Sequence, residues 1–226
     1  MDIENEISKA KELNMSGKKA AGAGDFEKAA EFFKSASEIY KCIDDSINMA
    51  FQLFSLANCY HSLKKNTEAL DIYTKVYDLI KDNEKLLEYQ AIVLNNLGHL
   101  NVSIDDYDKA GNFFKKALRI YETIKNETGK ALQLQNIASV HRDLKENKQA
   151  LEAYFKSIEI FEKIEDRLGE GDQCTNIAYI YVCDNNVDEA LKWYKKAAGI
   201  YRDIHEDTKA DLTEKNIKQL EGHSRA

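Results

Sequence analysis

The sequence contains no proline, only one tryptophan, and no apolar run of the length needed to span a bilayer. Proline inside a helix removes a backbone hydrogen bond and forces a kink, so its absence leaves a succession of helices uninterrupted. The chain has 226 residues, of which 43% are apolar, yet its mean hydropathy is −0.55. This combination is typical of an all-helical soluble protein in which each helix keeps one polar face.

An excess of positive charge is also lacking, because 39 acidic residues outnumber 32 basic ones. The formal net charge is −7 and the pI is about 5.4. Because phosphate binding requires a basic surface, nucleic acid is not expected to be the main partner. The charged segment Met1–Glu6 has no apolar centre and does not resemble a secretory signal. We therefore expect a cytoplasmic protein without membrane insertion.

Motifs for metal binding and catalysis are missing as well. Cys42, Cys59, Cys174 and Cys183 show neither C-x-x-C spacing nor a neighbouring histidine pair, and Cys59 and Cys174 fit buried apolar positions. No H-E-x-x-H motif, glycine-rich phosphate loop or nucleophile–histidine–acid arrangement appears. The segment Asp105–Asp108 resembles a calcium loop but lacks its glycine and final glutamate, so helix capping is expected there. We predict that the protein is not an enzyme and needs no cofactor or metal.

What the sequence does contain is an internal repeat marked by an alanine. The marker alanines are separated by 40, 41, 40 and 40 residues, and they are Ala29, Ala69, Ala110, Ala150 and Ala190. Four residues after each marker stands an aromatic side chain, and ten residues after it stands Ile or Leu. The aromatic residues are Phe33, Tyr73, Phe114, Tyr154 and Tyr194. A small or modest residue stands seven positions after each marker, and a large apolar or aromatic residue stands eleven after it. Offsets of four, seven and eleven place side chains on one face of a helix, here called helix B of each repeat.

A second helix, helix A, precedes each helix B. Twelve residues before each marker alanine comes a small residue: Gly17, Ala57, Gly98, Ala138 or Ala178. The small residue permits close approach of helices A and B, and the ring of helix B fills the space beside it. Asp, Asn and Gly suit the turn between the two helices because they cap helix ends. The expected turn residues are Gly24–Asp25, Asn66, Asp105–Asp106, Asn147 and Asn185–Asn186.

These patterns predict a single solenoid over residues 1–226, built from five helix–turn–helix repeats and a final helix. The expected helix pairs span residues 3–21 and 25–43, 46–63 and 66–82, 86–103 and 106–125, 128–145 and 147–165, and 168–184 and 186–204. The repeats are thus about 3–43, 46–82, 86–125, 128–165 and 168–204. A capping helix is expected at about 208–221, with Leu212, Ile217 and Leu220 as its apolar stripe, and a loose tail at 222–226.

The small residue, marker alanine and following ring together resemble the tetratricopeptide repeat (TPR) family over Ile3 to Ile204. The period near 40 is similar to the longer-repeat subclass of kinesin light chains and cell-polarity adaptors. The resemblance implies an all-α, right-handed α-solenoid that acts in protein–protein interaction. Two departures are present: the proline that often closes helix B is missing, and Ser16 stands in the first repeat where the others have Leu or Ile.

Candidate ligand contacts lie on helix A, which lines the concave side in such solenoids. Fourteen residues before the marker alanine stands a ladder of asparagines, Asn96, Asn136 and Asn176, whose amides can pair with the backbone of an extended peptide. Alternatively, these amides bond to the next helix and only maintain the stack. Supporting residues on helix A are Asn58, His99, Arg142 and Tyr179, with Phe51 and Phe54 as candidate wall contacts and Tyr60 and Tyr181 as packing residues.

A subset of the resembled family grips acidic chaperone C-termini with a clamp of basic and amide side chains. Asn58 and Asn96 match that clamp, but Phe54, Leu132 and Asn136 stand where its cations would be. Without those cations the charge-assisted bonds to a carboxylate are lost, so this specificity is not expected.

The sequence thus favours a protein–protein interaction module that binds an extended or helical peptide of unknown identity in its concave groove. The alternative is a structural scaffold that works through its edges and convex face, either as a homo-oligomer or as an adaptor like the soluble NSF attachment proteins. An outward stripe of Phe32, Phe113 and Trp193 would serve that alternative, unless these rings pack between successive B helices. A monomer or weak homo-oligomer is expected.

Overall fold

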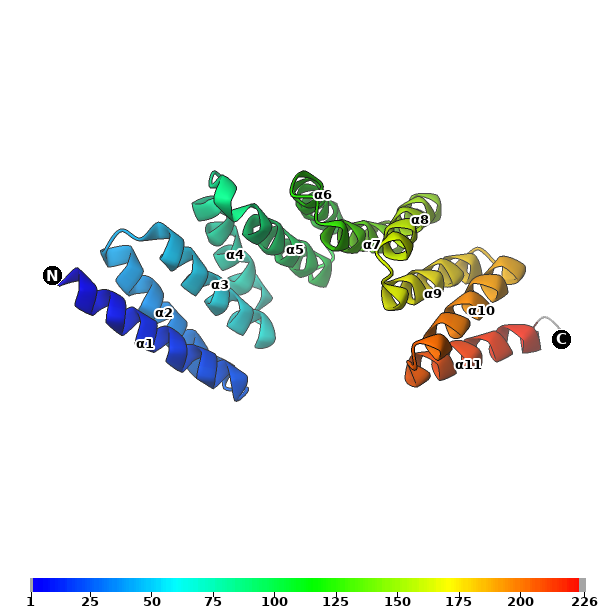
Figure 1. Ribbon diagram of the computed structural model, residues 1–226, viewed down its shortest axis with the longest axis horizontal. Coiled ribbons are helices and arrows are strands. Elements are labelled where there is room, and N and C mark those ends of the chain that lie inside the picture. Colours follow the sequence, from blue (N-terminus) through cyan, green and yellow to red (C-terminus); the bar gives the residue numbers. More distant parts are fainter. Residues whose placement is uncertain (1, 224–226) are drawn as a thin grey trace. The chain divides into compact units, whose positions relative to one another are not determined.

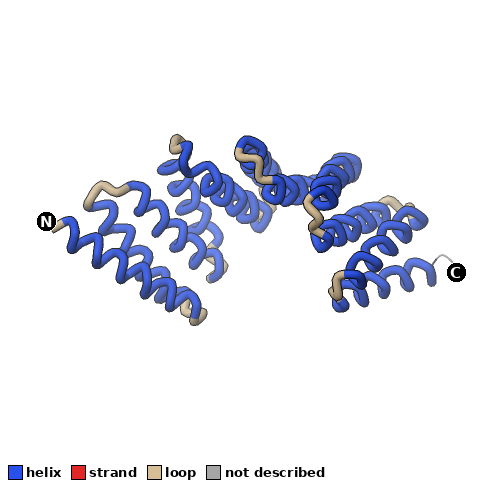
Figure 2. Tube along the Cα trace, in the orientation of Figure 1, coloured by secondary structure: helices blue, strands red, loops and turns tan. Residues whose placement is uncertain are grey.

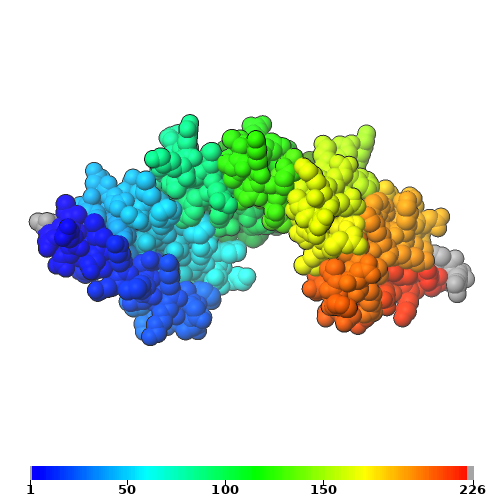
Figure 3. All heavy atoms as spheres, viewed as in Figure 1, coloured from blue at the N-terminus to red at the C-terminus, as the bar shows by residue number. Residues whose placement is uncertain are grey.

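The computed structural model describes residues 2–223, and within that range it holds eleven α-helices, one short 3₁₀ helix and no strand (Figures 1 and 2). The chain forms two compact units, Met1–Ile120 and Tyr121–Ala226, with the boundary inside α6. In each unit, successive helices lie side by side and pack through their side chains (Figure 3). The all-α fold expected from the repeat is therefore confirmed.

The helices begin and end within two residues of the bounds predicted from the repeat. They are α1 (Ile3–Gly22), α2 (Phe26–Cys42), α3 (Ser46–Ser62), α4 (Asn66–Ile80), α5 (Leu87–Ser103), α6 (Tyr107–Thr123), α7 (Glu127–Asp143), α8 (Asn147–Lys163), α9 (Arg167–Cys183), α10 (Val187–Asp203) and α11 (Asp207–His223). Odd-numbered helices from α1 to α9 are the A helices, and even-numbered ones are the B helices.

Nearly every link between helices is the same three-residue turn. One residue takes a left-handed backbone conformation, and the amide of the next residue bonds back to a carbonyl five residues earlier, as in Asp45 N to Tyr40 O at 2.9 Å. That next residue is the N-cap of the following helix, which begins one residue later. Asp25, Asp45 and Asp166 cap it by accepting a bond from a backbone amide three residues on.

The α4–α5 link is different and explains the one spacing of 41 residues. Here the chain makes a 3₁₀ helix, Glu84–Leu86, capped by Asn83 in place of the left-handed turn. The buried amide of Gln90 donates to the carbonyls of both Ile80 and Asn83 at 2.9 Å. The extra residue thus lies in a local turn, and the hydrogen bonds from Gln90 connect the backbone of this turn to α5.

Two predicted turn residues have another role. Asn66 and Asn147 are the first residues of α4 and α8 and do not cap them. Instead, Asn66 donates to Ser103 at 3.0 Å and Asn147 donates to Asp184 at 2.5 Å, each 37 residues along the chain. The predicted capping role is wrong at these two positions, because the amides reach the end of the next A helix.

The contact between a small residue and a ring sets the distance between helices A and B. A β-carbon added to Gly98 would lie 2.4 Å from the Phe114 ring, and one added to Gly17 would lie 2.8 Å from the Phe33 ring. Ala57, which holds the same position in the second repeat, is fully buried. The predicted close packing at this position is confirmed.

Helix α11 holds the place of an A helix, beginning forty residues after α9. Its Ala210 and Thr213 are buried, whereas Leu212 is 61% exposed, so the apolar stripe predicted through Leu212 is wrong by part of a turn. Arg202 of α10 pairs with Asp207, Asp211 and Glu214 and holds α11 in place. Gly222 and His223 continue the helix, and residues 224–226 of the predicted tail lie outside the described residues.

Replacing Gly98 with alanine tests the close contact. We expect Gly98→Ala to lower the free energy of unfolding by about 1–3 kcal/mol, because Phe114 must move to admit the methyl group. Gly199→Ala is the control: Gly199 is exposed in α10 and has no atom within 4 Å of an added β-carbon. That change is expected to stabilise by about 0.5–1 kcal/mol. Urea unfolding measures both, and equal effects would contradict the packing argument.

Candidate functional site

In the first unit, the asparagines of the predicted site converge on one tyrosine hydroxyl. Tyr73 of α4 donates to the amide oxygen of Asn58 on α3 and accepts from Asn96 Nδ2 on α5 at 3.2 Å. The Tyr73 side chain is buried, and this burial raises its pKa, so the hydroxyl keeps its proton. These two amides therefore link three helices, which is the stack-maintaining alternative considered for the ladder.

His99, the third predicted residue of this unit, lies exposed on α5 with its ring edge against Phe114 at 5.1 Å between centroids. Loss of water around the ring lowers the pKa of His99, and the nearby His61 lowers it further. The imidazole is therefore held toward its neutral form, in which it can both donate and accept a hydrogen bond.

Phe51 and Phe54, the predicted wall contacts, form an aromatic cluster with Tyr89 of α5. The ring centroids of Phe51 and Tyr89 are 4.9 Å apart in a T-shaped pair, and those of Phe54 and Tyr89 are 5.1 Å apart. All three side chains are half-buried. The cluster packs α3 against α5 while leaving part of each ring on the helix-A side of the unit.

The second unit uses a different side chain for the corresponding tyrosine. Tyr154 of α8 bonds Ser139 of α7 at 3.0 Å, and the predicted residue Arg142 lies half-buried close to it. The Arg142 guanidinium pairs with Asp143 at 2.8 Å. Asn136 is half-buried in α7 and has an interaction partner.

Asn176 differs from the other ladder members. It is half-buried in α9, and its side-chain amide forms no hydrogen bond with any described residue. Forty residues later, Asn216 of α11 stands at the same register and is also half-buried without such a bond. The second unit thus presents two amides, on neighbouring A-type helices, that keep their donors and acceptors available.

A hollow of about 520 Å³ opens beside the Asn216 amide. It is lined by Tyr179 and Val182 of α9, Tyr194 of α10, and Asn216, Gln219 and Leu220 of α11. Tyr179 is 50% exposed at its rim. The lining is apolar and amide-bearing and carries no formal charge, so the hollow fits an uncharged side chain better than a carboxylate.

Of the residues that line this hollow, the repeat pattern predicts Tyr179 as a ligand contact but does not predict Asn216. The signal for Asn216 is the period itself, since Asn176 and Asn216 are forty residues apart like the earlier ladder members. Asn216 lies in α11, outside the five helix pairs over which the ladder is predicted.

The aromatic residues of the alternative scaffold function are partly packed within their units. Trp193 lies 5.5 Å from Phe155, centroid to centroid, and the Lys196 ammonium lies above its ring. Phe113 packs against the core of the first unit. Phe32 is half-buried and lines a hollow between α1 and α2. Phe113 and Trp193 thus have packing partners within their own units.

Two known protein families match overlapping parts of the chain. A tetratricopeptide repeat model matches residues 45–123, and the soluble NSF attachment protein (SNAP) model matches residues 104–224, which is over half of the chain. The chain belongs to the SNAP family. The resemblance to tetratricopeptide repeats is also confirmed, and such repeats are generally non-catalytic modules for protein–protein interaction. No curated protein sequence matches this SNAP-family chain significantly.

Solved structures share the fold at low sequence identity. The apo form of RapI superposes with a TM-score of 0.80 at 18% identity, covering 87% of this chain and 72% of RapI. Aspartyl phosphate phosphatase F from Bacillus subtilis gives 0.80 at 17%, covering 93% of this chain but only 55% of the phosphatase. A putative kinesin light chain from Podosopora anserina gives 0.75 at 12%, covering 88% and 98%. At these identities the likeness establishes the helical-repeat fold alone.

The described residues contain neither a cluster of metal-binding side chains nor a helix suited to span a membrane. No group of three or more His, Cys, Asp or Glu side chains is placed to hold a metal ion among them. None of the helices they form is long and apolar enough to cross a membrane.

Removing the Tyr73 hydroxyl tests whether Asn58 and Asn96 serve the stack. We expect Tyr73→Phe to lower the free energy of unfolding by about 1–2 kcal/mol, because both amides lose their shared partner. Tyr77→Phe, on the same helix, is the control, since the Tyr77 hydroxyl bonds no described residue. Chemical unfolding of both variants decides the point, and a Tyr73→Phe protein as stable as the control would refute the linking role.

Proposed function

We propose that this SNAP-family chain is a non-enzymatic interaction module that binds an extended or helical peptide segment of a partner protein through its A helices. The proposed contacts are Asn58, Asn96 and His99 in the first unit, and Asn136, Arg142, Asn176 and Tyr179 in the second. The observation that carries the proposal is the free amide of Asn176, one helical turn from the Tyr179 hollow.

The chemistry of this region suits a peptide backbone with an apolar side chain. An asparagine amide offers two donors and one acceptor, and so it can bond a peptide N–H and C=O together. Tyr179, Val182 and Leu220 surround a hollow with room for a large aliphatic or aromatic side chain. The lining of the hollow carries no cation, and the nearby Arg142 is already paired with Asp143, so an internal segment is a better ligand than a terminal carboxylate.

The residues of the first unit contribute in a different way. Asn58 Oδ1 and Asn96 Nδ2 are hydrogen-bonded to the Tyr73 hydroxyl. The Asn58 amide nitrogen and the Asn96 amide oxygen have no partner among the described residues. They can therefore hold the stack and still contact a ligand. The name of the SNAP family describes attachment to another protein, NSF, and protein attachment is the part of that description that we adopt here.

The alternative is a scaffold that assembles through its edges and convex face. Its support was the stripe of Phe32, Phe113 and Trp193, and the half-burial of these rings weakens that support. Peptide binding on the A helices is better supported. The Asn176 amide has no hydrogen-bond partner among the described residues, and the hollow beside Tyr179 is open. Localisation in the cytoplasm, and a monomeric or weakly associated state, are part of the proposal.

Peptides selected from a random phage-displayed library on the immobilised protein provide the test. For a selected peptide, we expect Asn176→Ala to weaken binding by roughly fivefold or more, because a bonded amide contributes about 1 kcal/mol. Tyr179→Ala is expected to weaken it further by removing a wall of the hollow. Fluorescence anisotropy of the labelled peptide measures both dissociation constants.

Asn112→Ala serves as the matched control for the asparagine change, because Asn112 is exposed on the B helix α6. It should leave peptide binding unchanged. Circular dichroism of all variants confirms that helical content is preserved. Peptide binding that survives Asn176→Ala and Tyr179→Ala at wild-type strength would rule out this site as the binding surface.

A further inference from the structure

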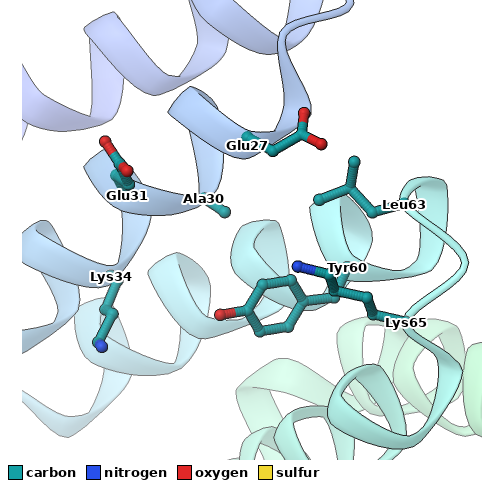
Figure 4. A pocket seen from close by; sticks show the side chains of 7 residues that line it. All are labelled: Glu27, Ala30, Glu31, Lys34, Tyr60, Leu63 and Lys65. Carbon is teal, nitrogen blue, oxygen red and sulfur yellow. The ribbon is translucent and has the colours of Figure 1, made fainter.

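A second surface lies on the helix-B side of the first unit, where α2 and α4 flank α3. Two adjoining hollows of about 250 and 280 Å³ share the side chains of Lys34 and Tyr60, so together they form one groove. Its floor is the α3 row Met49, Leu53, Leu56 and Tyr60. We call this surface the α2–α4 groove; Figure 4 shows its Glu27–Lys65 end, with Tyr60 facing Ala30 across the opening.

The groove exists because α2 carries small residues at two packing positions. Ala30 and Ser37 stand one and eight residues after their marker alanine, where the second repeat has Leu70 and Tyr77. Both line the groove, and both are more than nine-tenths buried. The volume that larger side chains would fill between two B helices is therefore open, and the apolar residues of α3 lie at its base.

The charges along the groove are unevenly distributed. Glu27 and Glu31 line one end together with Lys65, whose ammonium lies 5.7 Å from the centre of the Tyr60 ring. Lys34 lies between the two hollows, and Lys41 of α2 and Lys75 of α4 line the other end. These six charged side chains are exposed, and none forms an ion pair with any described residue. Only Glu38, also unpaired, interrupts the lysine end. In a chain of net charge −7, three lysines without counter-charges mark a place for an acidic partner.

The dimensions fit a helix. Glu27 and Lys41 are fourteen residues apart on α2, which is about 21 Å, or about four helical turns. The floor residues follow one another at helical spacing along α3. A helix lying in the groove would take the place that side chains of α2 leave empty.

We propose that the α2–α4 groove docks an amphipathic α-helix of a partner protein, with acidic side chains at the Lys34, Lys41 and Lys75 end. Basic side chains of the same helix pair with Glu27 and Glu31, and its apolar stripe covers the floor. This is helix-in-groove recognition, in which apolar anchors supply affinity and the charges fix the register. The α2–α4 groove lies in the first unit, whereas the Asn176 site lies in the second, and the proposal does not depend on that site.

The probe is a synthetic amphipathic helical peptide of about four turns, with leucines on one face, glutamates in one half and lysines in the other. Its control has the same composition with glutamates and lysines alternating. We expect the charge-separated peptide to bind at least about fivefold more tightly than the alternating one at low salt, and the difference to shrink as salt is added. Fluorescence anisotropy measures both.

Protein variants then locate the binding. Lys34→Glu should weaken the charge-separated peptide by roughly fivefold or more, whereas Lys28→Glu, on the same helix but outside the groove, should not. Ala30→Leu, which restores the side chain of the second repeat, should abolish binding by filling the groove. Asn176→Ala should leave this binding unchanged, so failure here is distinguishable from failure of the proposed peptide site.

Three results would overturn the proposal. The two peptides could bind equally, or Ala30→Leu could bind as the wild type does while thermal unfolding shows an intact fold. Alternatively, light scattering could find a dimer that Ala30→Leu converts to a monomer, in which case a second copy of the chain is the occupant.

Discussion

The contact between a small residue of helix A and a ring of helix B is the constraint on which the rest of the structure depends. At Gly98 and Phe114 the two helices approach so closely that one methyl group does not fit. This distance fixes where the neighbouring side chains of helix A emerge, including Asn96 and His99. A ring that carries a hydroxyl, as Tyr73 does, then also supplies the bond that joins three helices.

The helices could be predicted from the sequence because their causes are local and repeated. Small residues, rings and capping acids return at fixed offsets, so five copies reinforce one assignment. The errors arose where one residue departs from the repeat. Asn66 has the chemistry of a cap, but its amide reaches Ser103 of another helix. Leu212 has the chemistry of a core residue, but the register of α11 points it outward.

The candidate site was less predictable because identical residues at one register have different partners. Asn96 bonds Tyr73, which precedes it on α4, whereas Tyr154 is bonded by Ser139 and leaves Asn176 without a partner. The residue eleven positions before the marker alanine of the tyrosine does not decide the outcome, because Asn58 holds that position in the second repeat and Tyr73 bonds both Asn58 and Asn96. The sequence contains all of these residues, but only the packed helices show which of the possible pairs form.

On the helix-B side of the first unit, variation at packing positions creates a groove. Ala30 and Ser37 keep the period but not the volume of the second repeat, so the helices still stack while a groove remains between α2 and α4. When a repeat keeps its spacing but carries smaller side chains at packing positions, a new surface forms and the fold stays the same. The unpaired lysines on its rim give that surface a preference for acidic side chains of a partner. Packing does not require lysine at these positions, because lysine is rarely buried in a core.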